Sequence, residues 1–206
     1  MTGTDTNVGK TVIAAGLAAV LGGTYWKPVQ CGLDGATDSQ IVARLSGISP
    51  DRILPETWRL NAPASPHLAA EIDGVAIVPT ALTPPDVEGP LIIEGAGGLL
   101  VPLTRDLLFA DVFARWGIPI ILVAGTILGT INHTLLSIEA IRRRSIPFAG
   151  LIFSGDGGED SMRTISAFSG VPILGRLPVL DPLNSATLAT AFRNHIALEM
   201  LAPVSA

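Results

Sequence analysis

Residues 3–11 read Gly3-Thr4-Asp5-Thr6-Asn7-Val8-Gly9-Lys10-Thr11, and an alanine-rich apolar stretch follows them directly. A glycine-bearing loop that opens a helix directs backbone N–H groups toward one point, where the helix dipole adds positive potential. Such a loop suits phosphate, with Lys10 placed to reach the β- and γ-phosphates of a nucleotide and Thr11 placed to hold Mg²⁺. Five residues separate Gly3 from Gly9, one more than the strict pattern, and a glycine turn that merely caps a helix is the alternative.

Downstream of this loop, apolar runs alternate with amphipathic or alanine-rich stretches. The apolar runs lack in–out alternation, which is typical of parallel strands buried on both faces. The succession predicts a doubly wound α/β fold of the P-loop NTPase type, a mostly parallel sheet with helices on both faces. We expect strands near residues 24–26, 90–93, 118–124, 148–153 and 171–174, and helices near 10–21, 38–46, 66–71, 109–116, 132–144, 160–168 and 185–201.

The length of 206 residues suits one domain that spans residues 1–206. Only Met1 and Thr2 precede the loop, although a loop of this kind normally follows a central strand. The first strand is therefore expected to be truncated. Losing most of a central strand would cost several kcal/mol of apolar burial, so we expect the natural chain to start upstream.

Composition excludes several classes of protein. Hydrophobic residues make up 48% of the chain and charged residues only 15%, which argues against disorder. The net charge of −5 argues against a nucleic-acid partner, and a single cysteine argues against a disulfide scaffold. The longest uncharged apolar stretch, residues 117–131, is too short and too interrupted to span a membrane. Since the N-terminus also lacks a basic, apolar leader, we expect a cytoplasmic protein without a membrane partner.

An acidic residue ends one of the apolar runs. Leu91-Ile92-Ile93 is followed by Glu94 and then by Gly95-Ala96-Gly97-Gly98. A carboxylate at such a strand end can lie beside the phosphate loop and hold Mg²⁺ directly or through water. The glycines let the backbone approach phosphates closely. The alternative is a glutamate that simply faces solvent.

The chain has only two lysines among its 13 basic residues, and both lie in glycine- or proline-bearing loops. Lys10 belongs to the phosphate loop, and Lys27 ends an apolar run in the stretch WKPVQCG at 26–32. Because the chain otherwise uses arginine, both positions are predicted to need a compact ammonium rather than a planar guanidinium. A surface lysine is the alternative for Lys27.

Taken together, several stretches resemble one family, the dethiobiotin synthetases. Residues 3–11 are similar to the family's phosphate loop, including its extra residue. The other similar stretches are KPVQCG at 27–32, ASPH at 64–67, EGAGG at 94–98, LGTINH at 128–133 and the late segment 172–178. Their number and order are specific, and the resemblance covers nearly the whole chain.

This resemblance implies an ATP- and Mg²⁺-dependent ligase of biotin synthesis. CO₂, supplied as such or as bicarbonate, adds to one amine of 7,8-diaminononanoate and gives a carbamate. The γ-phosphate of ATP then activates the carbamate as a carbamic-phosphoric anhydride, and the second amine closes the ring of dethiobiotin, with ADP and phosphate as the other products. Negative charge develops on carbamate and phosphoryl oxygens, so preorganised cations and N–H groups should carry the catalysis.

The family's functional residues carry over onto positions of this chain. Lys10 and Lys27 are the expected catalytic cations, and Thr11, Asp38 and Glu94 are the expected metal ligands, with a helix N-cap as the alternative for Asp38. The residues expected at the nucleotide are Asn7, Val8, Gly9, Lys10, Thr11, Val12, Asp38, Glu94, Gly95, Ala96, Gly97 and Ser154. Those expected at the diamine are Cys31, Gly129, Thr130, Ile131 and Asn132.

In the family, the segment around Asn132 binds the substrate carboxylate in a site that the other subunit completes. The resemblance therefore implies a homodimer with shared active sites. The residues agree with this role, since Asn132 is expected to begin a helix, and a helix N-terminus binds a carboxylate well. An ordinary asparagine cap is the alternative.

Three positions depart from the family's pattern. Cys31 stands where relatives often have serine or threonine, and a thiol is a weaker hydrogen-bond partner; a small buried hydrophobe is its alternative interpretation. Ile127 stands where some relatives carry a basic residue. Ser154 stands where relatives often carry an asparagine that reads adenine, so we expect looser selection of the nucleotide base.

Other functions compete with this interpretation. A nucleotide-switch ATPase of the chromosome-partitioning type tends to have a second lysine in its loop and a basic partner helix, whereas Lys10 is the only lysine of this loop. An amide-forming ligase of the cobyrinate type is usually far longer and carries a glutaminase domain. An impaired paralogue stays open because of the short N-terminus and the three departures.

Overall fold

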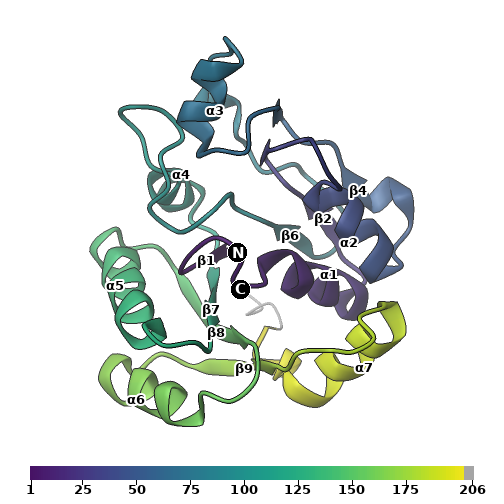
Figure 1. Cartoon of the computed structure of the whole chain (residues 1–206), viewed down its shortest axis with the longest axis vertical. Helices are drawn as coiled ribbons and strands as arrows, with labels where there is room; N and C mark the ends of the chain where they lie inside the picture. Colours follow the sequence, from purple (N-terminus) through teal and green to yellow (C-terminus); the bar gives the residue numbers. More distant parts are fainter. Residues whose placement is uncertain (202–206) are drawn as a thin grey trace.

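The computed structural model describes residues 1–201, and its strands and helices alternate along much of the chain, except that β2 is followed by β3 and β4 by β5 (Figure 1). The strands are β1 (Thr2–Gly3), β2 (Thr24–Trp26), β3 (Val29–Cys31), β4 (Ile53–Leu54), β5 (Trp58–Leu60), β6 (Leu91–Ile93), β7 (Ile120–Gly125), β8 (Phe148–Ser154) and β9 (Ile173–Leu177). The α-helices are α1 (Lys10–Leu21), α2 (Asp38–Ser46), α3 (Pro66–Ile72), α4 (Phe109–Trp116), α5 (Thr130–Arg143), α6 (Glu159–Ser169) and α7 (Ser185–His195). Short 3-10 turns cover Pro50–Arg52, Pro79–Ala81 and Leu198–Leu201.

All of the strands pair in parallel, as the unalternated apolar runs predict. One sheet has the order β1-β7-β8-β9 and another the order β4-β2-β6. Backbone hydrogen bonds from Gly95 to Met1 and from Leu99 to Gly3 join the chain after β6 to β1. The two sheets therefore meet at β1, directly before the phosphate loop.

Helices cover both faces of these sheets, and successive strand residues face opposite layers. Val123 and Ile152 belong to a buried cluster with apolar residues of α1, α2 and α7. Leu122 and Phe153, their neighbours in sequence, belong to a second cluster with residues of α4, α5 and α6. This double coverage confirms the predicted doubly wound α/β fold and accounts for much of the chain's apolar content. Among residues 1–201, no helix has both the length and the apolar character needed to cross a membrane.

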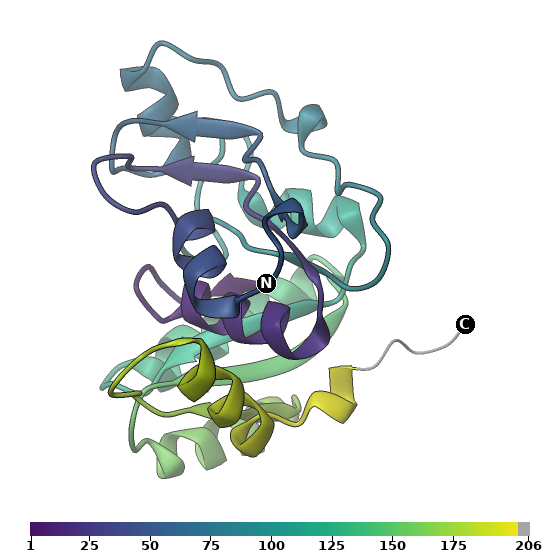
Figure 2. The ribbon, with the colours of Figure 1, turned by 90° about the vertical axis from the view of Figure 1, so that its right-hand side faces the viewer.

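Three details differ from the sequence-based expectation. The helix expected over 185–201 ends at His195, because Ile196 is extended and forms a bridge with Gly175. Helix α5 begins at Thr130, two residues before the expected start. Strands β3, β4 and β5 were not anticipated. Strand β4 pairs with β2, whereas β3 and β5 pair with each other beside α3 and extend the molecule beyond α2 (Figure 2).

Candidate active site

The phosphate loop connects β1 to α1 and leaves the start of that helix open. Asn7 and Gly9 adopt left-handed backbone conformations, with φ of 60° and 91°. Gly9 is the N-cap of α1 and offers no side-chain cap, so the first N–H groups of the helix can face an anion. Lys10 folds back over the loop, where its Nζ donates to the carbonyl oxygen of Asp5 at 2.8 Å.

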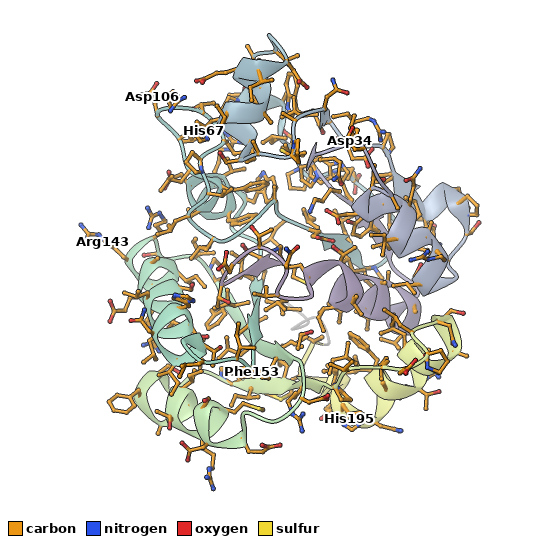
Figure 3. All side chains as sticks on the ribbon, in the orientation of Figure 1. Asp34, His67, Asp106, Arg143, Phe153 and His195 are labelled. Carbon is orange, nitrogen blue, oxygen red and sulfur yellow. The ribbon has the colours of Figure 1, made fainter. Side chains whose placement is uncertain are left out.

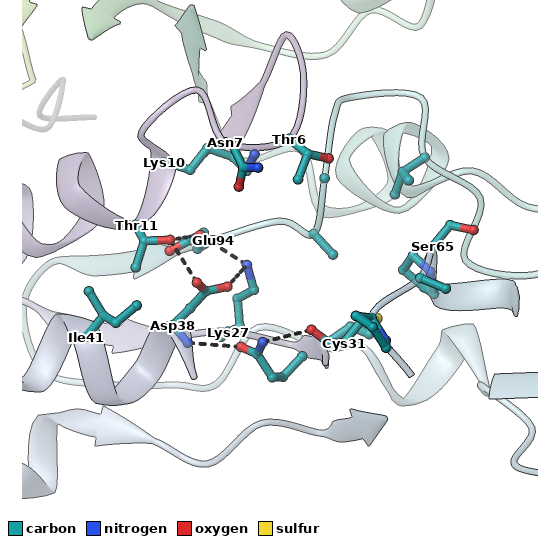
Figure 4. A pocket seen from close by; sticks show the side chains of 18 of the residues that line it. Thr6, Asn7, Lys10, Thr11, Lys27, Cys31, Asp38, Ile41, Ser65 and Glu94 are labelled. Atoms are coloured by element: carbon teal, nitrogen blue, oxygen red, sulfur yellow. Dashed lines mark hydrogen bonds and ion pairs between the residues drawn. The ribbon is translucent and has the colours of Figure 1, made fainter. Parts of the chain in front are cut away.

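Two carboxylates and an ammonium meet beside this loop (Figure 4). Glu94 and Lys27 are only 1% and 3% exposed. Lys27 Nζ lies 3.0 Å from Glu94 Oε1 and 2.7 Å from Asp38 Oδ2. Thr11 Oγ1 lies 2.9 Å from Asp38 Oδ1 and 3.0 Å from Glu94 Oε1. We call these four residues the charge cluster; each of them was singled out from the sequence, and each comes from a different element or strand end.

The members of the charge cluster stabilise one another's charged forms. Burial would lower the pKa of Lys27, but the carboxylates of Glu94 and Asp38 outweigh that effect and raise the pKa. Burial would likewise raise the pKa of Asp38, but Lys27 and the Thr11 hydroxyl hold it below its usual value. Lys10 behaves differently, because burial and the neighbouring charge of Lys27 lower its pKa to about 8. An anion bound beside Lys10 would favour its charged form.

Two side chains that the sequence analysis did not single out hold this cluster in place. The Tyr25 hydroxyl donates to Glu94 Oε2 at 2.8 Å. Gln30 Oε1 accepts from the backbone N–H of Asp38 at 3.1 Å, while Gln30 Nε2 donates to the Cys31 carbonyl oxygen. Strand alternation offered a signal for Tyr25, since it precedes Lys27 by two residues and such residues share one face. Gln30 lies within the stretch KPVQCG that resembles the family, but no role was predicted for it.

The charge cluster lies at one end of a cavity of about 670 Å³, a size suited to a small ligand. The phosphate loop and the start of α1 line the same end. Cys31 and the uncharged segment 63–66 line the other end, where Figure 4 shows Cys31 and Ser65 well away from Thr11. The cavity thus combines an end suited to phosphate and metal with an end suited to an uncharged or apolar group.

Cys31 provides a chemical test of this cavity, because it is the chain's only cysteine and burial raises its pKa to about 11. At pH 7.5 roughly one thiol in three thousand would be ionised, so N-ethylmaleimide should react slowly. We expect the labelling rate to rise about a hundredfold between pH 7.5 and pH 9.5, with activity lost in proportion. Mass spectrometry would count the label. Cys31→Ser should stay active and unlabelled, whereas full activity of completely labelled protein would contradict the placement of Cys31 in the site.

The other residues predicted at the nucleotide are distributed around the loop. Those that line the cavity are Asn7, Gly9, Lys10, Thr11, Val12, Ala96 and Gly97. Gly95 does not line it: its N–H donates to Met1 O, and a Cβ there would lie 2.8 Å from Phe113. Val8 also lies outside the lining. Ser154 ends β8 against the loop, since a Cβ on Gly9 would lie 2.3 Å from Ser154 Oγ.

The segment 129–132 lies away from this cavity within the chain. Gly129 caps α5, and the Thr130 hydroxyl donates to Gly125 O, so it closes its own turn. Asn132 is exposed at the start of the helix. A separate hollow lies next to α5 and is lined by Thr4, Asp5, Thr6, Gly98, Leu99, Leu100, Val101, Pro102, His133, Leu136 and Ser137. Of the residues predicted at the diamine, the structure thus brings only Cys31 to the main cavity.

The histidines lie outside the charge cluster. Figure 3 shows His67 at the α3 end of the molecule and His195 at the end of α7, far from each other. His67 Nδ1 hydrogen-bonds with Ser65 Oγ at 3.1 Å. Within residues 1–201, no three histidine, cysteine, aspartate or glutamate side chains form a metal-binding group.

Comparisons with known proteins agree with these observations. A family model described as an AAA domain matches residues 1–187. A protein of Rhodopseudomonas palustris strain BisB18 is 62% identical over 199 residues, which cover 97% of this chain and 95% of that protein. A protein of Rhizorhabdus wittichii is 60% identical over 98% of this chain and 97% of its own length, and one of Agrobacterium fabrum is 58% identical over 96% and 93%. Each of the three is named an ATP-dependent dethiobiotin synthetase.

Proposed function

The chain belongs to the family of ATP-dependent dethiobiotin synthetases, and we propose that it joins CO₂ across the two amines of 7,8-diaminononanoate. It is a ligase that forms C–N bonds and makes dethiobiotin for biotin synthesis with ATP. In the proposed reaction, a carbamate forms on one amine, receives the γ-phosphoryl group of ATP and is attacked by the second amine. The observation that carries this proposal is the charge cluster, which lies beside an open phosphate loop and at one end of the cavity.

The charge cluster fits Mg²⁺ by the chemistry of its donors. Asp38 Oδ1 lies 2.9 Å and Glu94 Oε1 3.0 Å from the Thr11 hydroxyl oxygen, so two carboxylate oxygens and one hydroxyl oxygen gather there. Mg²⁺ prefers such hard oxygen ligands and is usually bound by one or two carboxylates together with phosphate oxygens. We propose that these three residues hold the metal, which would neutralise charge on the transferred phosphoryl group.

The two lysines act on the same region from different sides. Lys10 reaches over the phosphate loop, where an ammonium neutralises the transferred phosphoryl group together with the N–H groups at the start of α1. Lys27 is fixed between two carboxylates, so its ammonium stays charged at the point where carbamate oxygen and phosphoryl oxygen approach each other. Cys31 and the segment 63–66 would surround the diamine, whose chain is apolar between its amines and its carboxylate.

Incubation of the protein with MgATP, bicarbonate and 7,8-diaminononanoate tests the proposal. We expect dethiobiotin and ADP in equal amounts, both lost when the diamine or Mg²⁺ is omitted. ATP turnover that the diamine leaves unchanged would instead support a nucleotide-switch ATPase. An absence of turnover together with tight nucleotide binding would support an impaired paralogue.

We further propose that the enzyme works as a homodimer with shared active sites. The segment 129–132 lies outside the main cavity of its own chain, although a helix N-terminus such as that of α5 suits the substrate carboxylate. The surface around this segment is strongly apolar, with Leu128 fully exposed, Ile127 79% exposed and Leu136 55% exposed. A second copy that covers this surface would bring its own 129–132 segment to the first copy's cavity.

Complementation between two inactive variants would reveal such sharing. Glu94→Gln removes a charge from the cluster, and Asn132→Asp places a negative charge where the substrate carboxylate would bind. Each variant alone is expected to be nearly inactive. A 1:1 mixture whose subunits have exchanged should regain about a quarter of wild-type activity, because half of the dimers are then mixed and each mixed dimer has one intact site of two. Asn194→Asp, the same change at an exposed position of α7, serves as the control and should keep activity. An inactive mixture in which native mass spectrometry shows mixed dimers would contradict shared sites.

A further inference from the structure

Tyr25 is the chain's only tyrosine, and its side chain is completely buried next to the charge cluster. It belongs to β2 and packs in the apolar cluster that α1, α2 and α7 form with the sheet. Its hydroxyl donates to Glu94 Oε2 at 2.8 Å. The backbone of the neighbouring Trp26 accepts from the Glu94 N–H at 2.9 Å. Strand β2 therefore holds Glu94 at both its main chain and its carboxylate.

The two oxygens of Glu94 consequently have different surroundings. Oε2 faces Tyr25, whereas Oε1 lies 3.0 Å from Thr11 Oγ1 and 3.0 Å from Lys27 Nζ. A glutamate carboxylate can otherwise turn about its last bond and offer both oxygens to one cation. The ring of Tyr25 is enclosed by packed side chains and cannot follow such a rotation.

We propose that Tyr25 is a positioning residue that sets cation specificity: it retains Glu94 Oε2, so that Oε1 alone is presented to a divalent cation. One-oxygen coordination suits Mg²⁺, which requires near-octahedral geometry, whereas Ca²⁺ accepts more ligands and readily takes both oxygens of one carboxylate. Partners of metal-bound carboxylates in proteins orient their ligands in this way, and their loss lowers metal affinity about 10- to 100-fold. This inference rests on the proposed binding of Mg²⁺ by Asp38, Glu94 and Thr11.

Tyr25→Phe removes the hydroxyl and keeps the ring, so it isolates the proposed effect. Mn²⁺, which resembles Mg²⁺ in its ligands and geometry, can be titrated in the presence of ADP while electron paramagnetic resonance reports the free ion. We expect the Mn²⁺ dissociation constant of Tyr25→Phe to rise about tenfold or more. Ca²⁺, added as a competitor, should displace Mn²⁺ from the variant at a lower ratio of Ca²⁺ to Mn²⁺ than from the wild type.

The ratio of the Mn²⁺ and Ca²⁺ affinities separates an effect on the position of Glu94 from a general loss of order in the site. Ser169→Ala is the matched control, because it also removes a buried hydroxyl that donates a hydrogen bond, in α6 and outside the cavity lining. Ser169→Ala should leave the dissociation constants of Mn²⁺ and Ca²⁺ unchanged. Equal weakening of Mn²⁺ and Ca²⁺ in Tyr25→Phe, or no change in either, would overturn the inference. A wild type that binds no Mn²⁺ with ADP would instead refute the proposed metal site itself.

Discussion

Replacing Lys27 by methionine is expected to lower turnover and stability together. The variant leaves the carboxylates of Asp38 and Glu94 facing each other without their shared counter-ion, and Glu94 is almost completely buried. Removing one partner of a buried ion pair typically costs about 3–5 kcal/mol of unfolding free energy. For a chain of this length, the melting temperature would fall on the order of 10 °C. Turnover should fall about 100- to 1000-fold, as it does when a preorganised donor to developing negative charge is removed.

The loss of stability in Lys27→Met should depend on Mg²⁺ and on pH. Mg²⁺ should raise the melting temperature of the variant more than that of the wild type, because the unpaired carboxylates attract the cation more strongly. In the wild type, Lys27 holds the pKa of Asp38 below its unfolded value, so this contribution to stability is present at neutral pH and is lost as the pH falls through the folded pKa. In the variant, the partly buried Asp38 carboxylate lacks the Lys27 counter-ion, so Asp38 takes up a proton more readily than it does in the unfolded chain. The stability gap between the two proteins should therefore narrow from pH 7 to pH 5.

Lys27→Arg serves as the control for charge. Its guanidinium keeps the positive charge but cannot match the compact ammonium that lies 2.7 Å and 3.0 Å from two separate carboxylates. We expect it to regain part of the stability and little of the turnover. Calorimetry and the dethiobiotin assay measure the two quantities. Normal turnover in Lys27→Met would remove Lys27 from the mechanism.

Gly9→Ala is expected to weaken nucleotide binding about a hundredfold, because a strained backbone conformation and a steric clash each cost on the order of 1–3 kcal/mol. Gly9 has φ of 91°, where alanine is strained, and its new Cβ would lie 2.3 Å from Ser154 Oγ. Either the loop or the end of β8 must then move. Titration calorimetry with a nonhydrolysable ATP analogue would measure the change.

Two further variants separate the contact from the backbone strain. In Gly9→Ala with Ser154→Gly, the contact with Ser154 is removed while the strain stays, so we expect a partial recovery of about tenfold. Gly22→Ala adds alanine at φ of 58° at the other end of α1, with nothing within 4 Å of the new Cβ. It carries the backbone cost without a steric clash and should bind nucleotide normally. Equal affinity of Gly9→Ala and the wild type would show that the loop does not approach β8 in solution as it does here.

Much of the fold could be predicted because local patterns and tertiary packing agree. The helices over Lys10–Leu21, Asp38–Ser46 and Phe109–Trp116 occur with the expected bounds, since apolar spacing and a following glycine mark each of them. The pair β3–β5 could not be anticipated, because each of these three-residue strands has a polar central residue, Gln30 or Arg59, and so does not stand out as an apolar run. The predicted end of α7 at residue 201 was wrong. Apolar residues continue to Leu201 and favour a longer helix, but the helix ends at His195 because Ile196 pairs with Gly175.

The site could be predicted in part for the same reason. Lys10, Thr11, Lys27 and Glu94 stand in glycine- or proline-bearing stretches with recognisable chemistry, and the structure brings them together. The role of Tyr25 depends on a contact between segments far apart in sequence, because Tyr25 and Glu94 are separated by 69 positions. Gln30 contacts the nearby Asp38, but the sequence does not show that the intervening loop folds back to bring them together. Periodicity places such residues on a face but does not name the partner opposite them.

The meeting of two sheets at β1 has a consequence for how the ligand and the fold depend on each other. Strand β1 is two residues long, and the chain beside it leads on one side to β6 and Glu94 and on the other to β7 and β8, which ends at Ser154. A nucleotide bound to the phosphate loop would contact the chain where the two sheets meet, so it would hold the two sheets together. The stability of the contact between the two sheets and the affinity for nucleotide would then be linked thermodynamically. Nucleotide binding would stabilise this contact, and a more stable contact would raise the affinity for nucleotide.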